Sequence, residues 1–302
     1  MDFDRSWEAL LQPEEATSYF DLWPDLPPFD PSLPGYRSAN AWWLAEFSRL
    51  VYRRDPGDPL ESSPQTDGLT RKNQLERVGW EEVDFQALPE AQFNVLRPQA
   101  AGDRPFVVVA FRGTHDLEDV FTDLKVARKD WLGNTQVHAG FKDAYDEIAE
   151  VLASSLRPAL GDVVFTGHSL GGALASLAAT VRQPLVLYTF GCPLVGDPSF
   201  AALLSPAWAY RLVDAQDVVP TVPPVELGFA HGGLEHPLVS ADPPSPAPAA
   251  ERWLLDFLTR KVGIPKEDLK LAFPGSPPAF LSDHAPVNYV AAIEQEGAPA
   301  EG

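Results

Sequence analysis

Apolar and polar positions along the chain predict an alternation of strands and helices in its middle part. Continuous apolar runs, rich in β-branched residues, occupy residues 106–111, 163–165 and 185–190. Such runs are typical of strands that are covered on both faces. Between them, residues 138–156 and 170–181 carry apolar positions at helical spacing. This order predicts an α/β fold with a mainly parallel central sheet and helices on both faces.

The segments on either side of this region extend the predicted fold. Apolar residues recur at helical spacing within residues 40–52, which predicts a helix that faces the core. Residues 78–96 predict two strands joined by a turn at Pro89, an antiparallel pair at the edge of the sheet. Residues 208–213 predict one further strand.

Two proline-rich stretches interrupt the regular pattern. We interpret residues 1–35 as an N-terminal extension and residues 36–302 as one domain, with an insertion at about residues 223–281. His231 and His236 lie among the glycines and prolines of this insertion. We therefore expect both to be solvated loop residues.

The balance of charge and the cysteine content restrict the possible functions. The formal net charge of −20 repels nucleic acid and anionic surfaces, so we expect no nucleic-acid partner. Cys192 is the single cysteine, and no residue spacing typical of a zinc site occurs, so we expect neither a metal nor a cofactor. The first residues are acidic, and no apolar run long enough for a signal peptide follows them. These features lead us to expect a cytoplasmic protein.

A G-x-S-x-G motif at residues 167–171 lies between a predicted strand and a predicted helix. This is the context of a nucleophile elbow, where glycines make room for a strained turn that presents the serine hydroxyl. Ser169 is therefore the candidate nucleophile. The N–H of Leu170, at the head of the helix, is the expected first oxyanion donor. His168 is too close to Ser169 along the chain to turn back onto it as a base.

A serine hydroxyl near neutral pH needs a histidine base that a carboxylate orients. In α/β-hydrolases the order along the chain is serine, acid, histidine. His284 fits this order best, because it precedes an apolar segment that can anchor it. For the acid, Asp217 follows a predicted strand and Asp214 remains its rival. Asp197, which precedes a proline, is more typical of a helix cap.

Taken together, these segments resemble the class 3 lipase family, the fungal-type triacylglycerol lipases and their bacterial relatives. The resemblance covers residues 36–222 and 282–293. Its motifs lie at residues 111–114, 137–141, 167–173, 189–197 and 217–220, and at His284 with Tyr289. The resemblance implies an α/β-hydrolase fold. Secreted members of the family carry disulfides, which a chain with one cysteine cannot form within itself, so we do not expect an extracellular role.

The resemblance also implies roles for individual residues. Ser169, Asp217 and His284 would form a catalytic triad, which favours Asp217 over Asp214. Thr114 would supply the second oxyanion donor. A lid helix that opens at lipid surfaces would follow the oxyanion strand. Its apolar face in this chain would consist of Leu117, Val120, Phe121 and Leu124.

We therefore expect a serine carboxylic-ester hydrolase that cleaves acylglycerols or related lipid esters and touches lipid interfaces transiently. The same triad could serve a phospholipase or a soluble short-chain esterase, and acyl-chain-length profiling would separate these activities. An alternative of another class is a catalytically silent hydrolase fold that acts as a binding module. Failure of a fluorophosphonate probe to label Ser169 would favour that alternative.

Overall fold

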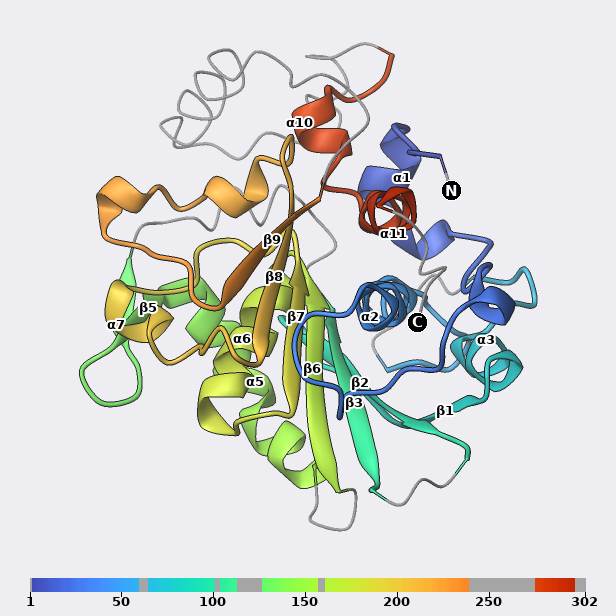
Figure 1. The fold of residues 1–302 in the computed structure, drawn as a ribbon, viewed down its shortest axis with the longest axis horizontal. Coiled ribbons are helices and arrows are strands. Elements are labelled where there is room, and N and C mark those ends of the chain that lie inside the picture. Colours follow the sequence, from blue (N-terminus) through green and yellow to red (C-terminus); the bar gives the residue numbers. More distant parts are fainter. Residues whose placement is uncertain are drawn as a thin grey trace.

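The structure, a computed structural model, describes residues 2–59, 65–100, 104–112, 127–156, 161–238 and 275–296. Its central sheet consists of β1 (Trp80–Ala87), β2 (Gln92–Pro98), β3 (Phe106–Arg112), β6 (Asp162–His168), β7 (Val186–Phe190), β8 (Ala209–Asp214) and β9 (Leu234–Leu238). These seven strands lie side by side in the order β1-β2-β3-β6-β7-β8-β9 (Figure 1). A separate antiparallel pair joins β4 (Arg128–Asp130) to β5 (Gln136–His138).

The strand directions confirm the mainly parallel sheet. β3, β6, β7, β8 and β9 run parallel to one another. β2 pairs antiparallel with β3 on one side and with β1 on the other, so that β1 and β2 form an antiparallel pair at one edge, as the pattern of residues 78–96 predicts. β9 was not predicted. Its residues include Glu235, His236 and Pro237, and a proline inside a strand is tolerated at the edge of a sheet, where β9 lies.

Helices cover both faces of the sheet. α2 (Ser38–Leu50) and α11 (Pro286–Gln295) contact each other on one face, and α5 (Ala139–Ser155) and α6 (Leu170–Val181) contact each other on the other (Figure 1). The shorter helices are α1 (Trp7–Leu11), α3 (Arg71–Arg77), α7 (Pro198–Ala201) and α10 (Ala279–Ser282), with 3₁₀ turns η1 (Pro13–Glu15), η2 (Trp23–Asp25), η4 (Val219–Thr221) and η5 (Val225–Leu227).

Successive side chains of the central strands pack alternately into two separate hydrophobic cores. In β3, Val107 and Val109 belong to the core under α5 and α6, whereas Val108 and Ala110 belong to the core under α2 and α11. Neighbouring side chains of a strand point to opposite faces. A strand that packs on both faces must therefore be apolar at every position, which explains the continuous apolar runs.

The N-terminal stretch packs against the body of the molecule. Tyr19, Phe20 and Phe29 are buried in the core under α2, where the ring of Phe20 lies 5.6 Å from that of Phe47. α1 contacts both α10 and α11, so the first residues lie beside the last helix (Figure 1). Within the described ranges, no helix combines the length and the apolar character that crossing a membrane requires.

Candidate active site

Ser169 occupies a strained turn between β6 and α6. Its φ of 57° and ψ of −128° lie in a region that side-chain-bearing residues rarely adopt. Both glycines of the motif are required by close backbone contacts. A Cβ on Gly167 would lie 2.3 Å from the carbonyl carbon of Gly171, and one on Gly171 would lie 2.1 Å from the carbonyl oxygen of Phe111. The G-x-S-x-G spacing therefore lets α6 pack directly against β3.

The hydroxyl of Ser169 is buried, and the residue immediately precedes the first turn of α6. The residue is 4% exposed, and its Oγ has no hydrogen-bond partner among the residues that the structure describes. Leu170 is the first residue of α6. The first N–H groups of a helix lack intrahelical partners and carry the positive end of its dipole. A negative oxygen formed beside Ser169 would meet this N–H.

His284 lies between α10 and α11 and is 2% exposed. Its Nδ1 is 2.7 Å from Oδ2 of Asp217. Because a carboxylate oxygen accepts hydrogen bonds, Nδ1 carries a proton, and in the neutral form of the ring Nε2 then keeps a lone pair. Nε2 is buried and makes no hydrogen bond within the described part of the chain. His284 can therefore accept a proton at Nε2.

Asp217, in the turn after β8, is held by three donors. Oδ2 accepts from the hydroxyl of Tyr289 at 2.6 Å as well as from His284, and Oδ1 accepts from the N–H of Val219 at 2.8 Å. Burial and the nearby charge of Asp217 raise the pKa of Tyr289 well above its ordinary value, so that its hydroxyl remains a donor. Tyr289, Asp217 and His284 thus form a continuous hydrogen-bonded series.

The rival carboxylates have other partners. Oδ1 of Asp214 accepts from the N–H of Gln216 at 3.0 Å, and burial raises the pKa of Asp214 to about 7. Asp197 caps α7 by accepting from the N–H of Phe200 at 2.8 Å, as the sequence predicts. Of the candidate acids considered, Asp217 is the one that contacts His284.

Phe190 and Gly191, at the end of β7, connect the serine to the acid and base. The carbonyl of Phe190 accepts from the N–H of Ser169 at 2.9 Å. Gly191 has a φ of +57°, and a Cβ there would lie 2.8 Å from Oδ2 of Asp217 and 3.0 Å from Cε1 of His284. The residue must therefore be glycine for this pair to fit. Sequence reasoning included Gly191 in a motif without finding this role.

His168 supports the backbone of His284. Its Nε2 lies 2.7 Å from the His284 carbonyl oxygen, and its Nδ1 lies 3.2 Å from the hydroxyl of Tyr52. Burial lowers the pKa of His168 well below its ordinary value, so the ring is neutral. A neutral ring that donates from Nε2 accepts at Nδ1, which matches both contacts. The sequence excluded His168 as the base but gave no sign of this supporting contact.

The expectation that His231 and His236 are solvated loop residues is correct for the loop position of His231 but wrong for its solvation, and it is wrong for His236, which belongs to a strand. Nε2 of His231 lies 2.6 Å from the carbonyl oxygen of Pro220, and burial lowers its pKa to about 4. His236 belongs to β9, and its ring stacks on that of Tyr36 with centroids 3.8 Å apart. Both histidines are therefore packed against the fold.

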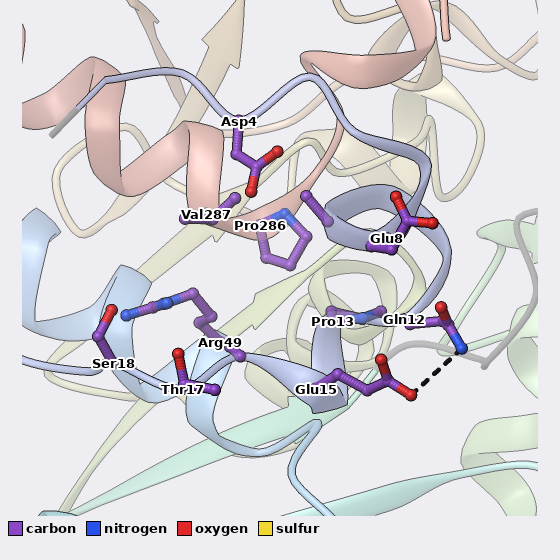
Figure 2. A pocket seen from close by; sticks show the side chains of 12 residues that line it. Asp4, Glu8, Gln12, Pro13, Glu15, Thr17, Ser18, Arg49, Pro286 and Val287 are labelled. Atoms are coloured by element: carbon purple, nitrogen blue, oxygen red, sulfur yellow. Dashed lines mark hydrogen bonds between the residues drawn. The ribbon is translucent and has the colours of Figure 1, made fainter. Parts of the chain in front are cut away.

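Some predicted features lie outside the described residues. These are Thr114, the lid residues Leu117, Val120, Phe121 and Leu124, and residues 239–274 of the insertion. The described residues contain no cluster of histidine, cysteine or acidic side chains that could hold a metal ion. A cavity of about 290 Å³, whose lining includes none of the three triad residues, lies between the N-terminal stretch and the start of α11 (Figure 2). Its lining includes Asp4, Glu8, Arg49 and Pro286.

Comparison with known proteins confirms the resemblance drawn from the motifs. Residues 108–227 match the family "Lipase (class 3)". The chain is 34% identical over 155 residues to a lipase of Rhizomucor miehei. The aligned region covers 45% of this chain and 43% of that protein. It is 34% identical over 147 residues to the secreted mono- and diacylglycerol lipase 1 of Fusarium solani, which covers 44% of each. The chain thus spans less than half the length of these relatives.

A solved structure shows the same fold. The native propeptide complex of Rhizomucor miehei lipase matches with a TM-score of 0.50 and 22% sequence identity, over 78% of this chain and 81% of that one. The fold is that of the α/β-hydrolases, with a mainly parallel central sheet and helices on both faces. The site described above lies at the carboxyl ends of β6, β7 and β8, where such sheets carry their reactive groups.

Proposed function

We propose that this class 3 lipase-like chain is a serine carboxylic-ester hydrolase that cleaves acylglycerols or related lipid esters through an acyl-enzyme on Ser169. One observation carries the proposal. A buried hydrogen-bonded series runs from Tyr289 through Asp217 to His284 and ends at Nε2, which has no hydrogen-bond partner within the described part of the chain. Gly191 and Phe190 join this series to the strained turn that holds Ser169.

The chemistry follows from the positions of the protons. Oγ of Ser169 attacks the ester carbonyl carbon while its proton moves to Nε2 of His284, and Asp217 stabilises the resulting imidazolium. The N–H of Leu170, with Thr114 as the second proposed donor, binds the tetrahedral oxyanion. The carbon–oxygen bond of the leaving alcohol then breaks, and that alcohol takes the proton from His284. Water repeats the sequence on the acyl-enzyme and releases the acid.

The names of the relatives support a lipid ester as the substrate, since they are a lipase and a mono- and diacylglycerol lipase. A phospholipase or a soluble short-chain esterase would use the same triad. Kinetics over a series of acyl-chain lengths, on monomeric and on emulsified esters, separates these activities. Preference for long chains in emulsion supports the acylglycerol assignment, and transient contact with a lipid interface is part of this proposal.

Replacement of the nucleophile tests the proposal directly. We expect Ser169→Ala to lower the turnover of a p-nitrophenyl ester by a factor of about 10⁶, as in other serine triads. A fluorophosphonate probe should label the unaltered protein and leave Ser169→Ala unlabelled. Ser154→Ala, which removes a hydroxyl on the exposed side of α5, is the matched control and should retain both properties. Hydrolysis that persists in Ser169→Ala would contradict the proposed nucleophile.

A further inference from the structure

The residue next to the base, Asp283, is a fully buried carboxylate whose partner comes from the opposite end of the chain. Asp283 is 0% exposed. Its Oδ1 accepts from Nε of Arg5 at 3.1 Å, across 278 positions of sequence, and from Oγ of Ser282 at 3.1 Å. The side chain of Arg5 is one-third exposed, so the cation reaches the buried carboxylate from the surface.

The surroundings of Asp283 make this cation important. Asp217, in the turn after β8, acts on Asp283 through its charge, and Asp283 in turn acts on Asp214 at the end of β8. Burial raises the pKa of Asp283, and Arg5 opposes this effect. Arg5 also opposes the raised pKa of Asp214. A carboxylate buried among other carboxylates needs such a partner to remain charged without distorting its surroundings.

A second contact fixes the same turn. The N–H of Asp4 donates to Oδ1 of Asn288 at 2.7 Å, and Nδ2 of Asn288 donates to the carbonyl oxygens of Asp4 and Ser282, each at 2.8 Å. Asn288 thus links the N-terminal residues to both ends of the turn that carries His284. Asp4 and Arg5 act on this turn from adjacent positions.

We propose that Arg5 is a positioning residue for the base, acting through Asp283 to hold the turn that places His284. The inference rests on the proposed hydrolase function. Without Arg5, the buried carboxylate of Asp283 must find water or take up a proton, and either response shifts the turn. A displacement of the base by about 1 Å can cost as much as about a hundredfold in rate.

Four variants test the proposal: Arg5→Ala, Arg5→Lys, Asp283→Asn, and the double variant Arg5→Ala with Asp283→Asn. We expect Arg5→Ala to lower kcat for p-nitrophenyl butyrate by about tenfold or more with little change in KM. Arg5→Lys keeps the charge and should recover part of the loss. The double variant should be more active than Arg5→Ala, because a neutral amide needs no cation. Arg97→Ala, which breaks an exposed ion pair with Glu81 on β1 and β2, is the control and should keep full activity.

The pH dependence separates positioning from general loss of structure. Protonation of Asp283 removes the charge that Arg5 balances. The ratio of unaltered to Arg5→Ala kcat should therefore be largest where Asp283 is charged and shrink as the pH falls and Asp283 takes up a proton. In the background of Asp283→Asn, the same ratio should stay close to one across the same pH range.

Thermal unfolding of the same variants completes the test. Coupling between Arg5 and Asp283 predicts that the shift in Tm of the double variant is smaller than the sum of the two single shifts. Full kcat in Arg5→Ala, a pH-independent loss, or additive shifts in Tm would each overturn the proposal. A failure of the proposed hydrolase function is seen separately, as absence of ester cleavage by the unaltered protein, and the coupling in Tm then decides whether Arg5 holds Asp283.

Discussion

Gly191 illustrates how a single hydrogen atom in place of a side chain shapes the site. We expect Gly191→Ala to lower kcat by about a hundredfold, because the added methyl group would displace Asp217 or His284 from their 2.7 Å contact. Alanine at this φ is also strained. Gly133→Ala provides the matched control, since its φ of +61° is similar but a Cβ there meets nothing within 4 Å. Comparable losses of kcat in both variants would indicate backbone strain in place of a collision with the triad.

Asp214 and Asp217 are both buried, yet their replacement by asparagine should have different effects. Replacement of Asp214 should raise stability, whereas replacement of Asp217 should lower kcat. The raised pKa of Asp214, about 7, means that the folded protein holds a proton there which the unfolded chain has lost above about pH 4. The free energy of unfolding therefore falls as the pH rises from 4 to 7. Asp214→Asn removes this penalty and should stabilise the protein at pH 8 by about 2 kcal/mol.

Denaturant unfolding at several pH values checks this expectation. The stabilisation by Asp214→Asn should shrink as the pH falls from 8 toward 4, and hydrolysis should persist. Asp217→Asn should instead lower kcat by about four orders of magnitude, because the base loses the partner that fixes its tautomer. Equal losses of activity in the two variants would mean that Asp214 takes part in the reaction.

The sequence identified the residues of the site whose chemistry is tied to a motif or to chain order. Ser169 follows from its elbow and His284 from its place after the acid. The choice between Asp214 and Asp217 remained open on residue pattern alone, because both follow the same strand, and the geometry brings Asp217 to His284. Arg5 could not have been found, since its contact with Asp283 joins positions that no local pattern relates.

At the scale of elements, the site depends on how closely α6 approaches β3. A Cβ on Gly171 would lie 2.1 Å from the carbonyl oxygen of Phe111, whereas one on Gly172 would lie 3.0 Å from Cβ of Cys192 and 3.1 Å from the carbonyl oxygen of Gly167. The collision at Gly171 requires a backbone displacement, whereas the close contacts at Gly172 require a shift of only a few tenths of an ångström. We expect Gly171→Ala to destabilise the fold by about 3 kcal/mol or more and Gly172→Ala by about 1 kcal/mol. Urea unfolding measures both, and the reverse order would refute this account of the packing.

The predicted elements succeeded where burial determines the pattern and failed where it does not. β3, β6 and β7 are apolar because both of their faces are covered, and α5 because one face is. β9 lies at the sheet edge and exposes Leu234 and Glu235, so its sequence lacks any regular alternation. Backbone pairing with β8 defines this strand, and such pairing leaves little trace in side-chain type.

At the scale of the whole molecule, the formal charge of −20 should govern which lipid surfaces the protein approaches. Like charges repel over a distance that salt shortens to about 3 Å at 1 M ionic strength. A triacylglycerol emulsion stabilised by phosphatidylcholine presents a neutral surface, and added phosphatidylglycerol makes it anionic. Repulsion between the acidic protein and an anionic emulsion acts before the active site contacts any lipid.

We expect hydrolysis at low salt to be about tenfold slower on the emulsion that contains phosphatidylglycerol, because local protein concentration falls at a surface of like charge. The difference should nearly vanish at about 1 M salt, where the repulsion is screened. Hydrolysis of a soluble short-chain ester serves as the control. Its rate should not depend on added phosphatidylglycerol, and salt should not produce a tenfold recovery. If the anionic emulsion is hydrolysed as fast as the neutral one at low salt, a local basic surface must overcome the net charge, and the lipid-facing part of the molecule would have to be sought around that surface.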